Sequence, residues 1–163
     1  MKTLLLMRHA KSSWKRSGLT DWERPLNKRG KRDAPRMGNR LWDEDLVPQR
    51  ILSSSAVRAQ QTAEAVAEAA GYDGEILYLD ELYGAGPLDH LQALGAVPDE
   101  PDPVLVIGHN PGLEDLLELL TEWMEHLPTA AIAHLRLPIE RWRDLRGDTA
   151  AELVQVWRPR ELA

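Results

Sequence analysis

The chain has 163 residues, of which 43% are hydrophobic and 28% charged, and its formal net charge at pH 7 is −6. This length is enough for one substantial hydrophobic core and too short for two ordinary domains, so we expect a single domain over residues 1–163. The absence of cysteine excludes disulfides, thiolate catalysis and cysteine-ligated metal centres.

The apolar segments indicate neither a membrane span nor a cleaved leader peptide. No apolar run approaches the roughly 20 residues that a membrane span requires. The N-terminal run MKTLLLM is followed at once by Arg8 and His9 rather than by a cleavage site. We therefore predict a soluble, cytoplasmic protein, with neither a membrane nor a nucleic acid as its partner.

The first predicted elements are a strand, a loop and a helix. Residues 2–7 (KTLLLM) form an apolar run too short for a stable helix, which predicts a buried strand. Residues 10–26 lack periodicity and predict a loop. Asn27 is a suitable N-cap for a helix that runs toward residue 45, in which Pro35 and Gly38 predict a kink or a restart.

The remaining chain continues to alternate between strands and helices and then ends in two strands. In chain order, the predicted elements are a strand at 49–53, a helix at 56–70, a strand at 75–79, a helix at 87–96, a strand at 103–107, a helix at 113–124 and terminal strands at 131–137 and 151–157. This alternation predicts an α/β fold with three α/β/α layers and a mainly parallel sheet.

The charge is distributed unevenly along the chain. Residues 1–40 contain 12 Lys and Arg against three Asp and Glu, whereas residues 41–163 contain 8 against 23. Neither Lys nor Arg occurs between Arg58 and Arg136. Most of these side chains are expected on solvated helix faces, and the alternative is a cationic rim that attracts an anionic substrate.

Four polar residues follow the ends of predicted strands. Arg8 and His9 come directly after the first strand, His109 follows the strand at 103–107, and Arg58 opens the helix after the second strand. In open α/β sheets, ligands bind beyond the carboxyl ends of the strands. Each residue alone could be structural or solvent-exposed. Together they predict a cage for a dianionic phosphoryl group, because guanidinium forks match its oxygens.

These segments occur in an order typical of one family. Arg8-His9-Ala10 is similar to an Arg-His-Gly motif, and residues 54–62 to a Ser-Ser-x-x-Arg-Ala-x-x-Thr segment. Pro25-Leu26-Asn27, with Gly30, resembles Pro-Leu-Thr-x-x-Gly, and Gly108-His109 a Gly-His that follows a strand. In these motifs, over essentially its whole length, the chain resembles the histidine phosphatase superfamily, which includes cofactor-dependent phosphoglycerate mutases and the SixA group.

The resemblance implies a phosphoglycerate mutase-like fold and a metal-independent phosphatase without a cofactor. His9 would attack phosphorus and carry the phosphate, while Arg8, Arg58 and His109 would bind the phosphoryl oxygens. The likeness to SixA implies phosphohistidine in a phosphorylated protein as the substrate. Two alternatives stay open: a phosphatase of small phosphoesters, and a phosphate-binding module without turnover.

The sequence departs from the family pattern in two places. Ala10 replaces a glycine, which leaves the placement of His9 in question. Larger relatives carry a general acid, and Glu81 is the one candidate in a matching place, although it could equally be a solvated loop carboxylate. A phosphoramidate can bring its own proton on nitrogen, so a SixA-like enzyme could do without this acid.

Two further expectations concern the rest of the chain. His90, His126 and His134 fit no part of the cage and are expected to be structural or surface residues. The segments 59–80 and 82–102 are too short to supply a lid, so we expect an open site that suits a phosphorylated protein better than a small metabolite.

Overall fold

The computed structural model describes residues 1–15 and 17–162. In this part of the chain, six strands form one sheet in the order β3-β2-β4-β1-β5-β6. The strands are β1 (Lys2–Arg8), β2 (Arg50–Ser54), β3 (Ile76–Leu79), β4 (Val104–Gly108), β5 (Ile132–Leu137) and β6 (Glu152–Trp157). The helices are α1 (Lys28–Asp43), α2 (Val57–Ala70), α3 (Pro87–Gly95) and α4 (Gly112–Thr121), with short 3₁₀ helices η1 (Asp80–Leu82), η2 (Trp142–Asp144) and η3 (Pro159–Glu161).

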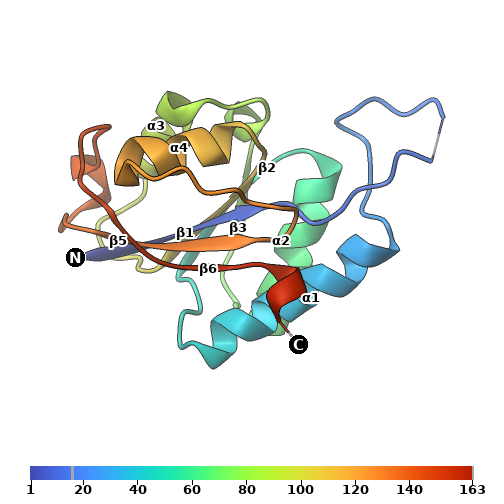
Figure 1. The fold of residues 1–163 in the computed structure, drawn as a ribbon, viewed down its shortest axis with the longest axis horizontal. Coiled ribbons are helices and arrows are strands. Elements are labelled where there is room, and N and C mark those ends of the chain that lie inside the picture. Colours follow the sequence, from blue (N-terminus) through green and yellow to red (C-terminus); the bar gives the residue numbers. More distant parts are fainter. Residues whose placement is uncertain (16, 163) are drawn as a thin grey trace.

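The sheet is parallel over its first four strands. β1 and β2 both pair with β4, and β3 pairs with β2, all in parallel. β5 is antiparallel to β1, and β6 is antiparallel to β5. The mainly parallel sheet predicted from the alternation of strands and helices is thus confirmed, with its antiparallel part at the edge formed by the end of the chain (Figure 1).

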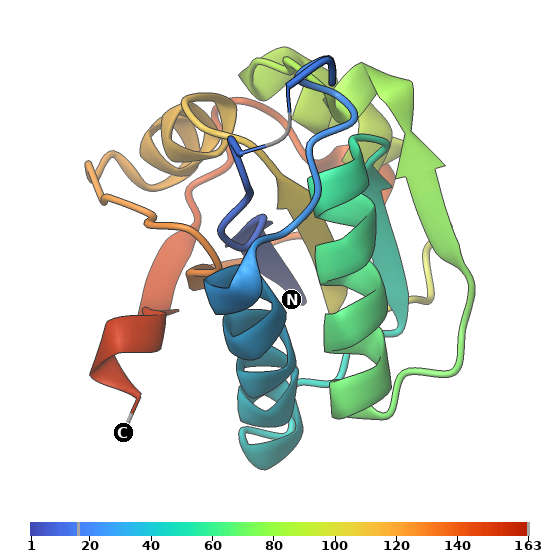
Figure 2. The ribbon, with the colours of Figure 1, turned by 90° about the vertical axis from the view of Figure 1, so that its right-hand side faces the viewer.

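Helices cover both faces of the sheet, which explains why the run in β1 is apolar throughout. Successive side chains of a strand point to opposite faces. Leu4 and Leu6 accordingly join the core cluster that also contains residues of α3 and α4, whereas Leu5 and Met7 join the cluster with α1 and α2. All four side chains are fully buried. Figure 2 shows α1 and α2 side by side on their face of the sheet.

α1 begins where the sequence predicts and then differs from the prediction. The Asn27 side chain caps it by accepting a hydrogen bond from the Gly30 amide at 2.9 Å. The expected restart at Pro35 or Gly38 is wrong, because α1 runs unbroken past both. A Cβ at Gly38 would lie 2.6 Å from the Val66 carbonyl oxygen of α2, so this glycine permits close helix packing rather than ending a helix.

α4 ends three residues before the end of the helix predicted over residues 113–124. It ends at Thr121 because Glu122 adopts a left-handed conformation with φ of 65°. Trp123 and Met124 therefore leave the helix and are 69% and 82% exposed. Four of the five leucines between residues 113 and 120 are buried and Leu119 is exposed, so the leucine spacing indicates the buried face of the helix but not where the helix ends.

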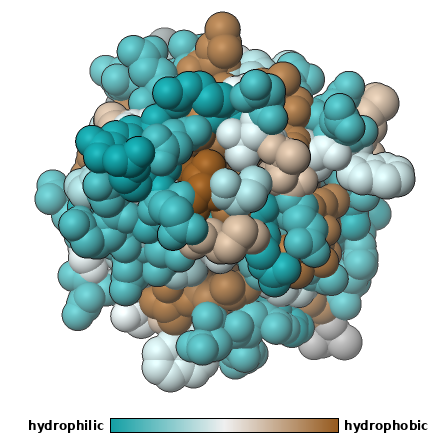
Figure 3. Space-filling view, turned by 90° about the vertical axis from the view of Figure 1, so that its left-hand side faces the viewer, coloured by the Kyte–Doolittle hydropathy of each residue, from teal (hydrophilic) through white to brown (hydrophobic). Residues whose placement is uncertain are grey.

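The end of the molecule at the start of β1 has a largely hydrophilic surface with small, separated hydrophobic areas (Figure 3). None of the described helices combines the length and the hydropathy that crossing a membrane would require.

Candidate active site

A cavity of about 450 Å³ lies where the carboxyl ends of β1 and β4 meet the first turn of α2. Its lining residues are Arg8, His9, Lys11, Ser12, Trp14, Asp21, Arg24, Arg58, Tyr83, Gly84, His109, Asn110 and Thr129. All four cage residues expected from the sequence are among them. The reason is the register of the sheet: Arg8 pairs with Gly108 in parallel, so His9 and His109 both follow one residue later. Their ring centroids lie 5.1 Å apart.

His9 is held in one tautomer by the chain itself. Its Nδ1 lies 2.7 Å from the Ala10 carbonyl oxygen, which can only accept, so Nδ1 carries the proton. Nε2 is left with its lone pair and accepts a hydrogen bond from Arg58 Nε at 3.3 Å. Burial, aided by the neighbouring His109, Arg58 and Arg8, lowers the pKa of His9 to about 3. The imidazole is thus neutral, and its unprotonated Nε2 can attack phosphorus once the hydrogen bond from Arg58 is released.

The Ala10 substitution does not disturb this placement. Among the non-glycine residues that the structure describes, positive φ values occur at Asp45, Glu122 and Ala130, so Ala10 needs no glycine conformation. The Ala10 amide donates to Thr62 Oγ1, which in turn donates to the Arg58 carbonyl oxygen. One threonine of α2 therefore connects the backbone after His9 to the backbone of Arg58.

Arg58 occupies the first turn of α2 and is 6% exposed. Its Nη1 donates to the Asp21 carbonyl oxygen at 2.6 Å, and its Nη2 donates to Asp21 Oδ2 at 3.0 Å. The guanidinium group also lies 3.5 Å from His109 Nδ1 through Nη2. A buried cation at a helix N-terminus opposes the helix dipole, and an anion beside it removes that conflict.

His109 has the opposite proton arrangement. Arg58 can only donate to its Nδ1, so the proton of the neutral ring is on Nε2, which lies 2.7 Å from Ser54 Oγ. Burial first, and the cationic Arg58 second, lower the pKa of His109 to about 4. At neutral pH this ring is therefore a neutral hydrogen-bonding group beside His9.

Arg8 carries an unsatisfied donor. Its Nη1 donates to the Leu127 carbonyl oxygen at 3.2 Å, while its Nε is buried without a hydrogen-bond partner among the described residues. The main chain around it is fixed by Ala130, whose amide donates to the carbonyl oxygens of both Arg8 and His9. Ala130 has φ of 68°, a conformation that costs a non-glycine residue roughly 1 kcal/mol or more.

Asp21 lies in the cavity although the sequence patterns did not indicate it as a site residue. Its carboxylate accepts hydrogen bonds from Arg58, from Tyr83 Oη at 2.6 Å and from Arg24 Nη1 at 2.6 Å. The hydrogen bond from Tyr83 comes first among the causes that hold the pKa of Asp21 well below its usual range. A signal was present, since Asp21 is one of only three carboxylates in the basic segment 1–40.

The described part of the loop, residues 10–15 and 17–26, forms one wall of the cavity and projects beyond the sheet (Figure 1). It supplies Asp21 and also Trp14, whose ring stacks on the Arg24 guanidinium with 3.3 Å between Cζ and the ring centroid. The later segments 59–80 and 82–102 contribute only Tyr83 and Gly84 to the described lining. Most of the cavity wall outside the phosphate cage therefore comes from the upstream loop and not from these later segments.

Glu81 is not brought to this cavity. It lies in η1, is exposed, and lines a separate pocket with Arg50 and Asp89. The turn of η1 buries Leu82 in the core, so the side chain that reaches the site from this segment is Tyr83. This placement corrects the expectation that Glu81 stands beside a leaving group.

The other three histidines also lie outside the cavity. His90 is buried with Nδ1 2.7 Å from the Gly86 carbonyl oxygen, His126 pairs with Glu114 at the surface, and His134 stacks on Trp157. Within residues 1–15 and 17–162, no group of three or more His, Asp or Glu side chains is arranged to hold a metal ion.

Comparisons with known proteins agree with this geometry. The model of the histidine phosphatase superfamily (branch 1) matches residues 4–84. A protein of Mycobacterium tuberculosis, Rv1276c, which is uncharacterised, is 33% identical over 156 residues, covering 89% of this chain and 95% of that protein. A solved structure from Nakamurella, provisionally assigned as the phosphohistidine phosphatase SixA, is 31% identical with a TM-score of 0.83, covering 97% of this chain and 96% of that one.

The chain belongs to the histidine phosphatase superfamily. A structure of the protein histidine phosphatase SixA complexed with tungstate is 26% identical, with a TM-score of 0.85 and coverage of 99% of both chains. The fold of this histidine phosphatase is thus that of SixA, as the motifs predict.

The lowered pKa of His9 predicts how the stability of this histidine phosphatase changes with pH. Unfolded His9 takes up a proton near pH 6.5, whereas folded His9 resists protonation until about pH 3. The contribution of His9 to the free energy of unfolding therefore decreases by about 1.4 kcal/mol per pH unit as the pH falls from 6.5 toward 3. Urea unfolding at pH 7 and pH 5 should show a smaller change for His9→Gln than for the wild type. Equal changes would mean that folded His9 titrates normally.

Proposed function

We propose that this histidine phosphatase removes phosphate from phosphohistidine in proteins, without a metal ion, through a phosphate carried on His9. The observation that carries the proposal is that the Asp21 carboxyl group in the cavity is ionised. Among the described lining residues, Asp21 is the only carboxylate, and three donors keep it ionised. An alkyl phosphoester needs a proton on its leaving oxygen, which an ionised carboxylate cannot give.

A phosphohistidine substrate does not need that proton from the enzyme. When its phosphate is on one ring nitrogen and a proton on the other, the ring departs directly as neutral imidazole. An ionised carboxylate can accept a hydrogen bond from that second nitrogen and stabilise the protonated, reactive form. Asp21 is 47% exposed, so its carboxylate is accessible to an incoming ring while Arg58 and Tyr83 hold it in place.

The first chemical step transfers the phosphoryl group to His9. The Nε2 lone pair attacks phosphorus, and the phosphorus–nitrogen bond of the substrate breaks with its electron pair passing to the departing imidazole. Arg58 Nε, which hydrogen-bonds to Nε2 at 3.3 Å, is then free to bind a phosphoryl oxygen instead. Arg8, whose Nε is buried without a partner among the described residues, is a second donor for these oxygens.

The second step hydrolyses the intermediate. Water attacks phosphorus, the bond to Nε2 breaks with its electron pair returning to His9 as a neutral imidazole, and the oxygen and both protons of the water leave with the phosphate as H₂PO₄⁻. The proton on Nδ1 stays in its hydrogen bond to the Ala10 carbonyl oxygen throughout. The Ala10 carbonyl oxygen thus accepts a hydrogen bond from the protonated ring nitrogen of His9. We propose that the Asp21 carboxylate does the same for the substrate ring.

The function is tested by comparing leaving groups. We expect kcat/KM for a phosphohistidine protein and for phosphoimidazole to exceed that for alkyl phosphates, such as phosphoserine or glycerol phosphate, by at least about 100-fold. A strong preference for one small phosphoester would instead favour the alternative reading as a phosphatase of small phosphoesters.

Independence from metal ions is a separate prediction. The proposed cage places guanidinium and imidazole groups where other phosphatases use divalent cations, so prolonged treatment with EDTA should leave the rate unchanged. The measurement is kcat with phosphoimidazole before and after treatment and after addition of Mg²⁺, Mn²⁺ or Zn²⁺. Loss of activity in EDTA that one of these ions restores would contradict the proposal.

Asp21→Asn should separate phosphoramidates from phosphoesters. The amide keeps the size of the side chain but loses its negative charge, so kcat/KM should fall about tenfold or more for phosphoimidazole and much less for p-nitrophenyl phosphate, whose leaving group needs no proton. Glu81→Gln is the matched control, because it makes the same change outside the cavity. A larger effect of Glu81→Gln than of Asp21→Asn would restore Glu81 as the acid.

A further inference from the structure

A second pocket, of about 290 Å³, lies beside the active-site cavity and is lined mainly by arginines. We call it the arginine pocket, and its charged residues are Arg29, Arg32, Asp33 and Arg36 of α1 and Arg160 of η3. Thr129 lines both this pocket and the active-site cavity, and it accepts a hydrogen bond from Arg29 Nη2 at 3.3 Å. The two hollows are therefore neighbours on one surface of the molecule.

The arginines of α1 are organised around one buried carboxylate. Asp33 is 4% exposed, and its oxygens lie 3.3 Å from Arg32 Nε, 3.4 Å from Arg36 Nη1 and 3.9 Å from Arg29 Nε. Each guanidinium group has five N–H donors, of which Asp33 engages only a part. Four arginines against one aspartate give the described lining a net charge of +3.

The position of these cations indicates what they can bind. The guanidinium groups of Arg29, Arg32 and Arg36 already converge on the Asp33 carboxylate. A further anion must therefore pair with the donors that Asp33 leaves unused, and carboxylates spread over a protein surface can reach several of these donors at once. The arginines are also accessible, since the side chain of Arg32 is 64% exposed and Arg160 is exposed as well.

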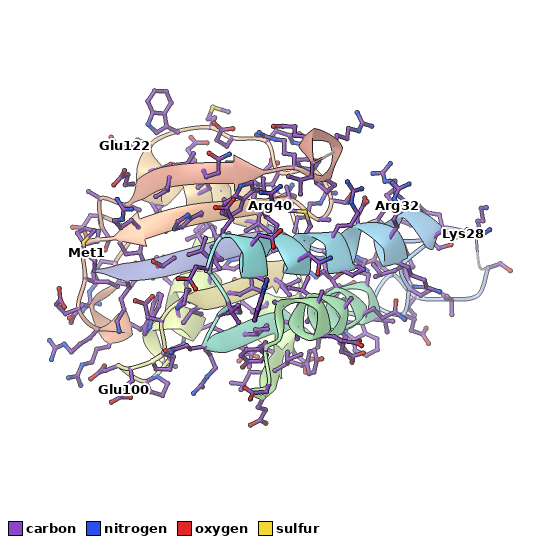
Figure 4. The ribbon with its side chains drawn as sticks, turned by 90° about the horizontal axis from the view of Figure 1, so that it is seen from below. Met1, Lys28, Arg32, Arg40, Glu100 and Glu122 are labelled. Carbon is purple, nitrogen blue, oxygen red and sulfur yellow. The ribbon has the colours of Figure 1, made fainter. Side chains whose placement is uncertain are left out.

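We propose that the arginine pocket is the docking site for an acidic surface of the phosphorylated protein whose phosphohistidine enters the neighbouring cavity. This inference rests on the proposed function and adds a partner chemistry to it. The pocket lies outside the phosphate cage, so it serves binding of the protein rather than the chemical step. Figure 4 shows α1 with Lys28 and Arg32 toward one end and Arg40 toward the other.

Arg40 provides a matched control on the same helix. It does not line the arginine pocket and pairs with Glu44 Oε1 at 3.1 Å near the end of α1. The test compares Arg32→Glu, Arg160→Glu and Arg40→Glu. All three make the same change in net charge, so a difference among them reports position rather than total charge.

The substrates are a phosphotransfer domain of net negative charge, phosphorylated on its histidine, and phosphoimidazole. At low salt we expect Arg32→Glu and Arg160→Glu to lower kcat/KM for the domain about tenfold through KM, to weaken its salt dependence, and to leave kcat/KM for phosphoimidazole unchanged. Arg40→Glu should change the domain value by less than about twofold. Equal losses in all three variants, no loss in any, or equal losses on phosphoimidazole would overturn the docking site.

The same data keep the two proposals apart. A wild type that is active on the domain, with Arg32→Glu and Arg160→Glu unaffected, contradicts the docking site and leaves the proposed function standing. A wild type that is active on small phosphoesters but inactive on the domain contradicts the proposed function, and the docking site fails with it. Arg32 is largely exposed, so its replacement is not expected to prevent folding.

Discussion

Replacement of His9 by alanine is expected to abolish turnover, lowering kcat on the order of 10⁶-fold as the loss of a covalent nucleophile does in other enzymes. His9 is the cavity histidine whose Nε2 is unprotonated, because the Ala10 carbonyl oxygen holds the proton on Nδ1. His109 has its proton on Nε2 and faces Ser54 with it. Rapid quenching of the wild type with labelled phosphoramidate should trap phosphate that is stable to base and labile to acid, and peptide mapping should place it on His9.

The control for this result is His126→Ala, which removes an exposed histidine outside the cavity and should leave kcat unchanged. Circular dichroism of His9→Ala should match the wild type, because only the small imidazole volume is lost. Phosphate trapped on His109 would reverse the roles of the two rings. Normal turnover by His9→Ala would show that the reaction does not proceed through a phosphate carried on His9.

Arg58→Ala is expected to lower kcat by about 10²- to 10³-fold, the usual cost of losing a donor that binds charge developing in the transition state. Among the described residues, Arg58 is the one side chain that contacts His9, His109 and Asp21 at once. Arg58→Lys should recover only a small part of the rate, because a single ammonium group cannot reproduce a planar fork that contacts three partners. Single-turnover kinetics with phosphoimidazole would measure the loss at the transfer step.

Arg136→Ala is a suitable control for Arg58→Ala, since Arg136 is an exposed arginine paired with Glu152 on the antiparallel edge of the sheet. It should leave the rate unchanged. If Arg58→Ala raised KM for phosphoimidazole while kcat stayed intact, Arg58 would bind substrate and transition state equally, and its place in the chemical step would be lost.

The sequence predicted the sheet and the four cage residues because both depend on short-range patterns. Apolar runs such as that of β1 mark strands buried on both faces, and the residue after each parallel strand must emerge at a shared edge. His9 and His109 were therefore placed without knowledge of the strand order. The pairing of Arg8 with Gly108 in the structure explains why the rings of His9 and His109 lie close together.

The parts that the sequence did not predict depend on the paths of loops. Asp21 reaches Arg58 only because the irregular segment after β1 folds back across the cavity, and neither periodicity nor a cap signals such a path. Glu81 and Tyr83 are two residues apart, and the turn of η1 decides which of them faces the site. The sequence of α1 predicts a kink or a restart at Gly38, because the close approach of α2 that requires this glycine is a tertiary contact that α1 alone does not reveal.

The strand order has a consequence for how this enzyme is made. β4 lies between β1 and β2 in the sheet, yet residues 104–108 are synthesised long after both. On the ribosome, β1 and β2 must therefore wait for β4 before either gains its central partner, and such long-range pairing makes folding slow. Until β4 arrives, His9 has no His109 beside it. The proposed phosphate cage is therefore complete only once β4 has filled the middle of the sheet.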